Sequence, residues 1–232
     1  MTSLKNSPAS VRQRLLNRAR KDKRPFNELL QYYAMERFLY RLSRSTHSDQ
    51  FILKGALMLR AWGSAEVRPT MDIDMLGRTS NDDAHIIDQI RDILAVEMEE
   101  DGLTFDPGSI RSSRITEDAD YEGIRIRFQG KLDSAKISMQ IDIGFGDVVY
   151  PKPEETDFPT LLESPVPRLL CYSQVSAIAE KFEAMVKHGM LNSRMKDFYD
   201  IWLLSRLFNF EGAMIAEAIS GECQGSCHLN QN

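Results

Sequence analysis

Two stretches near the middle of the chain alternate between apolar and polar residues. In the first, residues 123–130, Ile124, Ile126 and Phe128 point to one face while arginines point to the other. The second, residues 134–147, alternates in the same way after a short polar turn. A period of two is typical of a strand with one buried face. The pattern therefore predicts an antiparallel β-hairpin in the centre of the protein.

Segments on both sides of this hairpin show the apolar spacing of helices. Ser7 and Pro8 look like the cap and first turn of a basic helix, and Pro25 separates it from the next. Ser80 and Asp83 form a capping-box pattern at the start of another. Five prolines between residues 151 and 167 favour an irregular connection. The expected helices cover roughly residues 8–24, 26–42, 81–101, 173–188 and 193–208.

The apolar segment FILKGALMLRAWG leads into RPTMDIDM, which contains two aspartates spaced as Asp-x-Asp. Side chains two apart on a strand point the same way, so Asp72 and Asp74 share one face, opposite Ile73. Two neighbouring negative charges are stabilised when a hard divalent cation such as Mg²⁺ lies between them. The alternative is a surface strand whose acidic face is simply solvated.

Asp142 extends this pattern, because the alternation of its strand places it on the polar face. A third carboxylate arriving from a neighbouring strand would complete a two-metal site of the kind that serves phosphoryl transfer. Upstream, Gly55 interrupts an apolar run, and a glycine allows backbone amides to approach a triphosphate closely. The structural alternatives are a strand-end residue at 142 and a packing glycine at 55.

Charged side chains interrupt the apolar pattern of the two C-terminal helices. Lys181 borders an expected packed stripe made of Val175, Ile178, Phe182 and Met185. In the last of these helices, Lys196, Asp197 and Asp200 lie on the side opposite to Met195, Phe198, Ile201 and Trp202. This charged side is either a solvated surface or the source of a general base for an acceptor hydroxyl, with Lys196 or Arg194 holding phosphate.

Composition narrows the class of protein. The chain has 232 residues, 42% of them hydrophobic and 27% charged, and a net charge of −5. These values fit one sizeable globular domain or a catalytic core with helical additions. Residues 1–44 hold eleven Lys or Arg against three Asp or Glu, with a dense run at Arg18, Arg20, Lys21, Lys23 and Arg24. The run is either a solvated helix face or a local phosphate-attracting patch.

The cysteines and the N-terminal sequence predict a cytoplasmic protein. Cys171, Cys223 and Cys227 form no disulfide framework. No second ligand pair joins Cys223, Cys227 and His228 into a metal site. The N-terminal sequence lacks the apolar region of a secretion signal, and no segment approaches the roughly 20 apolar residues of a membrane span.

Five motifs occur in a familiar order, namely KGALML, RPTMDIDM, QIDIGFGD, AEKFEAM and RMKDFYD. Together they resemble the AbiEii/AbiGii toxin family within the DNA polymerase β-type nucleotidyltransferase superfamily, over roughly residues 10–210. The family numbers its own motifs differently: its first is the glycine-then-Asp-x-Asp signature, its second a lysine pair and its third a lone strand aspartate. The resemblance implies that Asp72 and Asp74 bind metal and that Asp142 supplies the aspartate of the third motif. The fourth motif, Arg-x-Lys-Asp followed three residues later by Asp, is matched in full by Arg194, Lys196, Asp197 and Asp200.

The chain departs from the family pattern at three points. The family has two lysines separated by four residues in its second motif, but only Lys181 fits, because position 186 is Val. Family members usually show Gly-Gly or Gly-Ser where this chain has Gly55-Ala56. Relatives also continue with more helices after the fourth motif, whereas the helical pattern here fades near Ile219.

The fold that the resemblance implies is α+β, with a nucleotidyltransferase-like mixed β-sheet core and helices packed on it. We expect N-terminal basic helices at 1–45, the core at 46–150 and a C-terminal helical part at 151–232. The implied enzyme is an NTP-dependent nucleotidyltransferase using Mg²⁺ or Mn²⁺, with Asp142 assisting as ligand or base and Asp197 or Asp200 serving the acceptor. The expected nucleotide contacts are Gly55, Thr70, Lys181, Arg194 and Lys196.

The resemblance also implies a biological setting. The protein would be the toxin of a bacterial toxin–antitoxin or phage abortive-infection pair. The implied acceptor is RNA, such as the 3′ end of tRNA. The implied partner is an antitoxin with a winged-helix DNA-binding part. Two alternatives stay open at this point: an NTP- or RNA-binding module without turnover, and a metal-dependent nuclease, because carboxylate clusters serve hydrolysis equally well.

Overall fold

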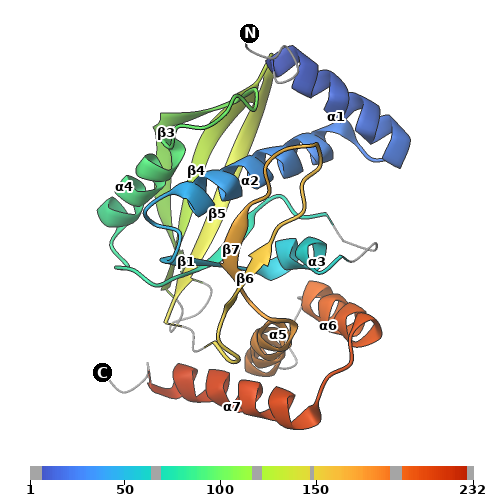
Figure 1. The fold of residues 1–232 in the computed structure, drawn as a ribbon. Helices are drawn as coiled ribbons and strands as arrows, with labels where there is room; N and C mark the ends of the chain where they lie inside the picture. The colour runs from blue at the N-terminus through green and yellow to red at the C-terminus, as the bar shows by residue number, and fades with distance from the viewer. Residues whose placement is uncertain (1–6, 64–68, 117–121, 147–148, 189–194, 229–232) are drawn as a thin grey trace.

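Figure 1 shows the computed structural model of the protein, which describes residues 7–63, 69–116, 122–146, 149–188 and 195–228. These residues form a seven-stranded mixed sheet with the strand order β3-β4-β5-β2-β1-β7-β6. The strands are β1 (Phe51–Lys54), β2 (Ile73–Gly77), β3 (Leu103–Thr116), β4 (Glu122–Leu132), β5 (Ala135–Phe145), β6 (Glu154–Asp157) and β7 (Arg168–Cys171). The helices are α1 (Pro8–Asp22), α2 (Phe26–Arg44), α3 (Met58–Ala61), α4 (Asp83–Leu94), α5 (Gln174–His188), α6 (Met195–Leu207) and α7 (Gly212–His228), and the 3-10 turn η2 (Gly55–Leu57) joins β1 to α3.

The predicted α+β class and the central hairpin are confirmed. β4 and β5 pair antiparallel, with Leu132 opposite Ala135 next to the turn. Four strands, β1, β3, β6 and β7, were not predicted from the sequence. β3 has no clean alternation and carries an irregularity between Asp106 and Arg111 where its pairing shifts. β6 and β7 form a second antiparallel hairpin inside the proline-containing stretch that favoured an irregular connection.

Two predicted helix boundaries are wrong. Asp82, not Ser80, caps α4, because its carboxylate accepts a hydrogen bond of 2.9 Å from the backbone N–H of His85. The helix ends at Leu94 rather than near Gly102. At the C-terminus, α7 continues to His228, beyond the point at which the apolar pattern fades. Helix α1 begins as expected, with Ser7 as its cap and proline in its first turn.

The helices α1, α2 and α4 cover one face of the sheet and enclose the main hydrophobic core (Figure 1). The apolar positions that alternate along β5 all lie in this core: Ile137, Met139, Ile141 and Ile143. Each fully buried side chain of this size contributes about 1.5–3 kcal/mol of transfer free energy. The alternate positions of β5 therefore face the other side of the sheet, and that side carries the polar residues described below.

The helices α5, α6 and α7 gather at one end of the molecule (Figure 1). They pack largely on one another through two small apolar clusters that include Ile178, Leu203 and Leu204 in one and Val175 and Ala218 in the other. Helix α5 also reaches the sheet, as the ion pair of Lys54 shows below. The expected division at residues 45 and 150 stays a prediction, and the sheet draws two strands, β6 and β7, from beyond residue 150.

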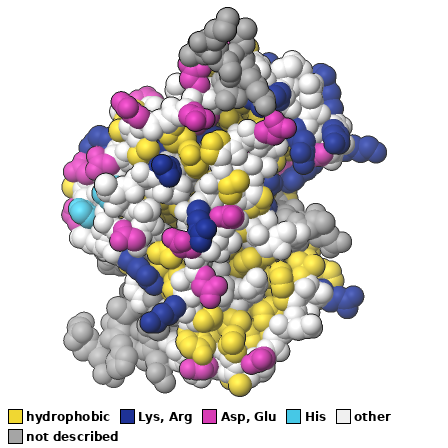
Figure 2. Space-filling view, in the orientation of Figure 1, with side chains coloured by type: hydrophobic (Ala, Val, Ile, Leu, Met, Phe, Trp, Pro, Cys, Tyr) yellow, Lys and Arg dark blue, Asp and Glu magenta, His cyan; other side chains and the backbone are white. Residues whose placement is uncertain are grey.

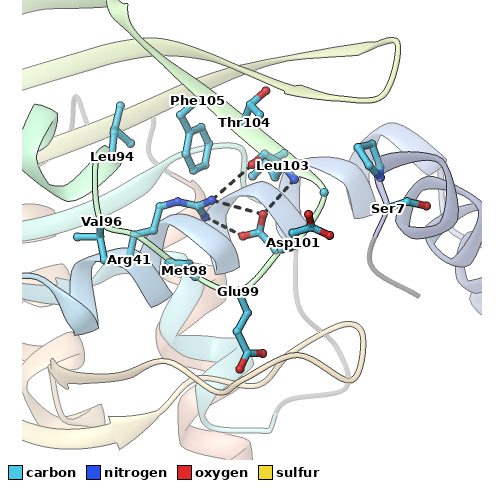
Figure 3. A pocket seen from close by; sticks show the side chains of 13 residues that line it. Ser7, Arg41, Leu94, Val96, Met98, Glu99, Asp101, Leu103, Thr104 and Phe105 are labelled. Atoms are coloured by element: carbon cyan, nitrogen blue, oxygen red, sulfur yellow. Dashed lines mark hydrogen bonds and ion pairs between the residues drawn. The ribbon is translucent and has the colours of Figure 1, made fainter. Parts of the chain in front are cut away.

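A hollow of about 540 Å³ lies between α4, the start of β3 and the N-terminal end of α1 (Figure 3). Arg41 and Asp101 line it and form a buried ion pair of 2.9 Å, and the Arg41 guanidinium also lies 4.9 Å from the ring centroid of Phe105. This hollow contains none of the predicted site residues. None of the described helices is both long and apolar enough to cross a lipid bilayer.

Candidate active site

Four charged residues form one row across the polar face of the sheet. Strand pairing places Lys54 opposite Asp74, Asp74 opposite Asp142, and Asp142 opposite Arg125. Directly paired residues in neighbouring strands point to the same face. The row therefore reads positive, negative, negative, positive across β1, β2, β5 and β4, with the two aspartates at its centre.

The three aspartates singled out from the sequence come together at this centre. One carboxylate oxygen from each of Asp72, Asp74 and Asp142 lies within 4.8 Å of the other two. All three residues are half-buried. Parallel pairing of β2 with β5 produces this proximity, because it aligns the polar faces of the two strands at Asp74 and Asp142. Their role as metal ligands stays a prediction.

Burial and then the neighbouring charge of Asp72 are the main causes that raise the pKa of Asp74 to about 7, while Lys54 acts in the opposite direction. This is the behaviour of carboxylates crowded together in a low-dielectric setting. A hard divalent cation takes carboxylate oxygens as ligands and relieves this repulsion. The donor set therefore fits a divalent metal ion such as Mg²⁺ or Mn²⁺.

Gly55 lies directly against the carboxylate of Asp74. Its φ of +71° is in the left-handed region that favours glycine. A Cβ atom built on Gly55 would lie 2.1 Å from Oδ2 of Asp74, so no larger residue fits without displacing that carboxylate. The absence of a side chain thus lets the backbone of the β1–η2 junction approach the centre of the row.

Thr70 acts on Asp72. Its hydroxyl donates a hydrogen bond of 2.6 Å to Oδ1 of Asp72, and its backbone N–H donates one of 3.2 Å to the hydroxyl of Tyr32. Both Thr70 and Tyr32 are buried. The sequence-based expectation for Thr70 was a phosphate contact, which stays a prediction, whereas the observed bonds orient the first aspartate of the Asp-x-Asp motif.

Sequence reasoning missed two partners of this row. Lys54 is buried and donates a hydrogen bond of 2.6 Å to Oε1 of Glu180 on α5. Arg125 binds Asp142 with two hydrogen bonds, of 2.8 Å from Nε to Oδ1 and 2.6 Å from its terminal nitrogen to Oδ2. A bidentate guanidinium–carboxylate pair fixes orientation as well as charge. Arg125 therefore holds Asp142 in place, and Lys54 ties α5 to the strand beside Asp74.

The acidic side of helix α6 faces inward, since Asp197 and Asp200 are buried, so the alternative of a solvated surface is wrong for these two residues. The apolar residues on the other side are exposed: Met195 by 70%, Trp202 by 52% and Phe198 by 42%. Phe182, expected in the packed stripe of α5, is also exposed. The physical reason is a buried cation that the apolar spacing does not reveal.

That cation is Lys181. Its Nζ lies 2.9 Å from Asp200 Oδ2 and 3.2 Å from Asp197 Oδ1, so α5 and α6 are joined by a buried ion cluster. Burial by itself lowers the pKa of Lys181, but Asp200, Asp197 and Glu180 together raise it above its ordinary value, so the ammonium stays charged. Lys196, another predicted site residue, is exposed on α6 and does not join the cluster. Arg194 lies outside the described residues.

We expect Lys181→Met to lower the free energy of unfolding by about 3–5 kcal/mol, because it leaves two buried carboxylates without their cation. Lys187→Met, at the exposed end of the same helix, is the matched control and is expected to stay within about 0.5 kcal/mol of the parent. Urea denaturation at pH 7 measures both. Equal stability of the two variants would contradict the role assigned to Lys181.

Comparison with solved structures identifies the fold. A protein from Helicobacter pylori assigned as a nucleotidyltransferase superposes with a TM-score of 0.50 and 12% identity, covering 88% of this chain and 94% of that chain. JHP933 from Helicobacter pylori superposes with a TM-score of 0.50 and 13% identity, covering 82% of this chain and 72% of that chain. At these identities the likeness concerns the fold alone. The fold is therefore that of nucleotidyltransferase-like proteins.

The family follows from the sequence of the chain as a whole. Residues 37–230 match the model of the family described as nucleotidyl transferase AbiEii toxin, type IV TA system. The chain therefore belongs to the AbiEii family of nucleotidyltransferase toxins, and the resemblance inferred from the five motifs is confirmed. No curated protein sequence matches the chain.

Proposed function

We propose that this protein transfers a nucleotide from an NTP to an RNA acceptor in a reaction that depends on Mg²⁺ or Mn²⁺. The observation that carries the proposal is the gathering of Asp72, Asp74 and Asp142 beside Gly55. Nucleotidyl transfer needs alignment of the reacting groups and compensation of phosphate charge. A carboxylate cluster beside a backbone that lacks a side chain suits both needs.

In this proposal the three aspartates hold the metal, which when bound neutralises charge on the phosphates. Thr70 keeps Asp72 in orientation through its hydroxyl. Both oxygens of Asp142 already accept hydrogen bonds from Arg125, which favours the ligand role of Asp142 over that of a base. The missing side chain of Gly55 makes room for the Asp74 carboxylate itself, and the proposed phosphate contact of Gly55 is made through its backbone amide.

The C-terminal helices supply the remaining groups. Lys181, kept charged by its two carboxylates, contributes positive charge at the junction of α5 and α6. Lys196 and Arg194 stay the predicted phosphate contacts of the following segment, and Arg194 lies outside the described residues. Between the two aspartates proposed to serve the acceptor hydroxyl, Asp197 is the better candidate. Its side chain is 10% exposed, whereas that of Asp200 is fully buried.

We further propose that the protein acts as the toxin of a bacterial toxin–antitoxin pair that aborts phage infection in the cytoplasm. The family match supports a toxin–antitoxin role. The proposed acceptor is RNA, with the 3′ end of tRNA as the first to test, and the proposed partner is an antitoxin with a winged-helix DNA-binding part. These finer assignments rest on the family resemblance.

Incubation of the pure protein with each labelled NTP, total RNA and Mg²⁺, followed by a denaturing gel, tests the proposal. We expect labelled RNA that is longer than the input, with no product when EDTA removes the metal. Shortened RNA would instead indicate a metal-dependent nuclease. Tight metal-dependent NTP binding by calorimetry without any product would indicate a binding module without turnover. Either of these results would refute the transferase assignment.

A further inference from the structure

The ring of Tyr32 on α2 lies close to two guanidinium groups from different parts of the chain. The Cζ atom of Arg60, on α3, is 4.4 Å from the centroid of its ring, and that of Arg24, just before α2, is 5.3 Å away. The hydroxyl of Tyr32 accepts the backbone N–H of Thr70, whose side chain holds Asp72. A continuous set of contacts therefore links this pair of arginines to the Asp-x-Asp motif.

Arg60 carries a charge that the described part of the protein does not neutralise locally. Its Nε atom is buried and has no hydrogen-bond partner among the described residues. Arg24 is paired with Glu28 and Arg18 with Asp22, but no described carboxylate forms an ion pair with Arg60. Burial lowers the pKa of Arg60, and the nearby charges of Arg24 and Arg18 lower it further, whereas Glu36 acts against them.

Like charges gathered around a half-buried cation are unfavourable unless an anion joins them. The guanidinium fork binds phosphate oxygens with two parallel hydrogen bonds and is weakly hydrated, which makes it the preferred cation for phosphate recognition. Nε of Arg60 has no partner among the described residues, and Arg24 lies against the same aromatic ring. These properties describe a phosphate-binding site.

The surroundings indicate a polynucleotide. Helix α1 carries basic residues over about three turns and ends next to Arg24. Figure 2 shows Lys and Arg side chains gathered along this helix, on a protein whose net charge is −5. The exposed members of this run are Arg18, Arg20, Lys21 and Lys23. A track of this length offers more positive charge than a single triphosphate can use, and it matches a chain of phosphodiesters.

We propose that Arg60 and Arg24 bind a backbone phosphate of the single-stranded end of the acceptor RNA, and that α1 continues the track along that strand. That this RNA is the acceptor of the reaction rests on the proposed function, whereas the binding of RNA at this site does not depend on it. The contacts through Tyr32 and Thr70 connect this phosphate site to Asp72, and we expect the end of the strand to extend from it toward the carboxylate cluster.

The test measures binding of a fluorescein-labelled 20-nucleotide single-stranded RNA in the absence of divalent metal, over a series of salt concentrations. Arg60→Gln is expected to weaken binding by roughly five-fold and to reduce the slope of log K against log salt by about 0.7, the value for one phosphate contact of a single strand. Arg91→Gln is the matched control, because Arg91 is an exposed arginine on α4, on the opposite flank of the molecule from α1 (Figure 1).

Arg18→Gln provides a second variant that does not depend on the packing around Tyr32, since Arg18 lies on the exposed side of α1. It is expected to reduce the salt slope in the same direction. If both variants bind the RNA like Arg91→Gln, the proposal is wrong. If they bind ATP more weakly but keep full RNA affinity, it is equally wrong, because the phosphate would belong to the donor. Since no transfer is measured, absence of transferase activity would overturn the proposed function and leave this result intact.

Discussion

Asp74→Asn is expected to lower the rate of nucleotide transfer by at least about 1,000-fold, and Asp72→Asn by a similar factor. Each substitution removes one negative ligand from the centre of the carboxylate cluster while conserving side-chain size. Removal of a group that stabilises charge at the reacting centre costs about 100- to 1,000-fold in related electrostatic sites, and loss of a metal ligand adds to this. Transfer of labelled nucleotide to total RNA, followed on a denaturing gel, measures the rate.

Thermal melting of Asp74→Asn shows whether the loss of activity comes from the metal site or from unfolding of the protein. In EDTA, Asp74→Asn is expected to melt about 2–4 °C above the parent, because it removes one of three mutually repelling charges. Added Mg²⁺ is expected to raise the melting temperature of the parent and not that of the variant. Asp157→Asn, an exposed carboxylate on the edge strand β6, is the control that should change neither property. Full transfer activity in Asp74→Asn would falsify the assignment of this aspartate.

Gly55→Ala is expected to lower both stability and activity. The added methyl group would meet Oδ2 of Asp74 at 2.1 Å, so either the carboxylate or the backbone of the β1–η2 junction must move. We expect a loss of about 3 kcal/mol in the free energy of unfolding and a fall in transfer rate of about 100-fold, because displacement of a reacting group by about 1 Å has effects of this size.

Gly63→Ala is a close control for this substitution. Gly63 has nearly the same backbone conformation, with φ +75°, but nothing lies within 4 Å of the position that an added methyl group would occupy. It should therefore report only the conformational cost of a left-handed alanine, about 1 kcal/mol, with no change in transfer rate. If Gly55→Ala and Gly63→Ala behave alike, contact with Asp74 is not what requires glycine at position 55.

Much of this site follows from the alternation of residues along the central hairpin. The alternation alone predicts that Asp142 lies on the polar face of its strand. The register of the hairpin also gives the partner of Asp142. With Leu132 opposite Ala135 at the turn, counting outward along the ladder brings Arg125 opposite Asp142. The register of a short hairpin is thus sufficient to predict that ion pair.

Other features depend on contacts between distant segments and have no local signal. Lys54 and Glu180 are 126 positions apart, and nothing in either neighbourhood indicates that they meet. The orientation of α6 is a similar case. Its apolar spacing favours burial of Met195 and Trp202, but the ion cluster around Lys181 turns the acidic side inward. Tertiary electrostatics overrides the amphipathic pattern here.

The ladder between β2 and β5 constrains how the length of this chain can vary. Asp74 is level with Asp142, and Ile73 with Ile141. One extra residue within β5 before position 141 would move a carboxylate into the hydrophobic interior and an isoleucine into its place, because strand side chains alternate with a period of two. Two extra residues would restore the face but would place Gln140 opposite Asp74 in place of Asp142, so the cluster fixes the length of β5 up to this position. The turn at Asp133 and Ser134 lies outside the ladder, so we expect extra residues to be accommodated there without a change of register.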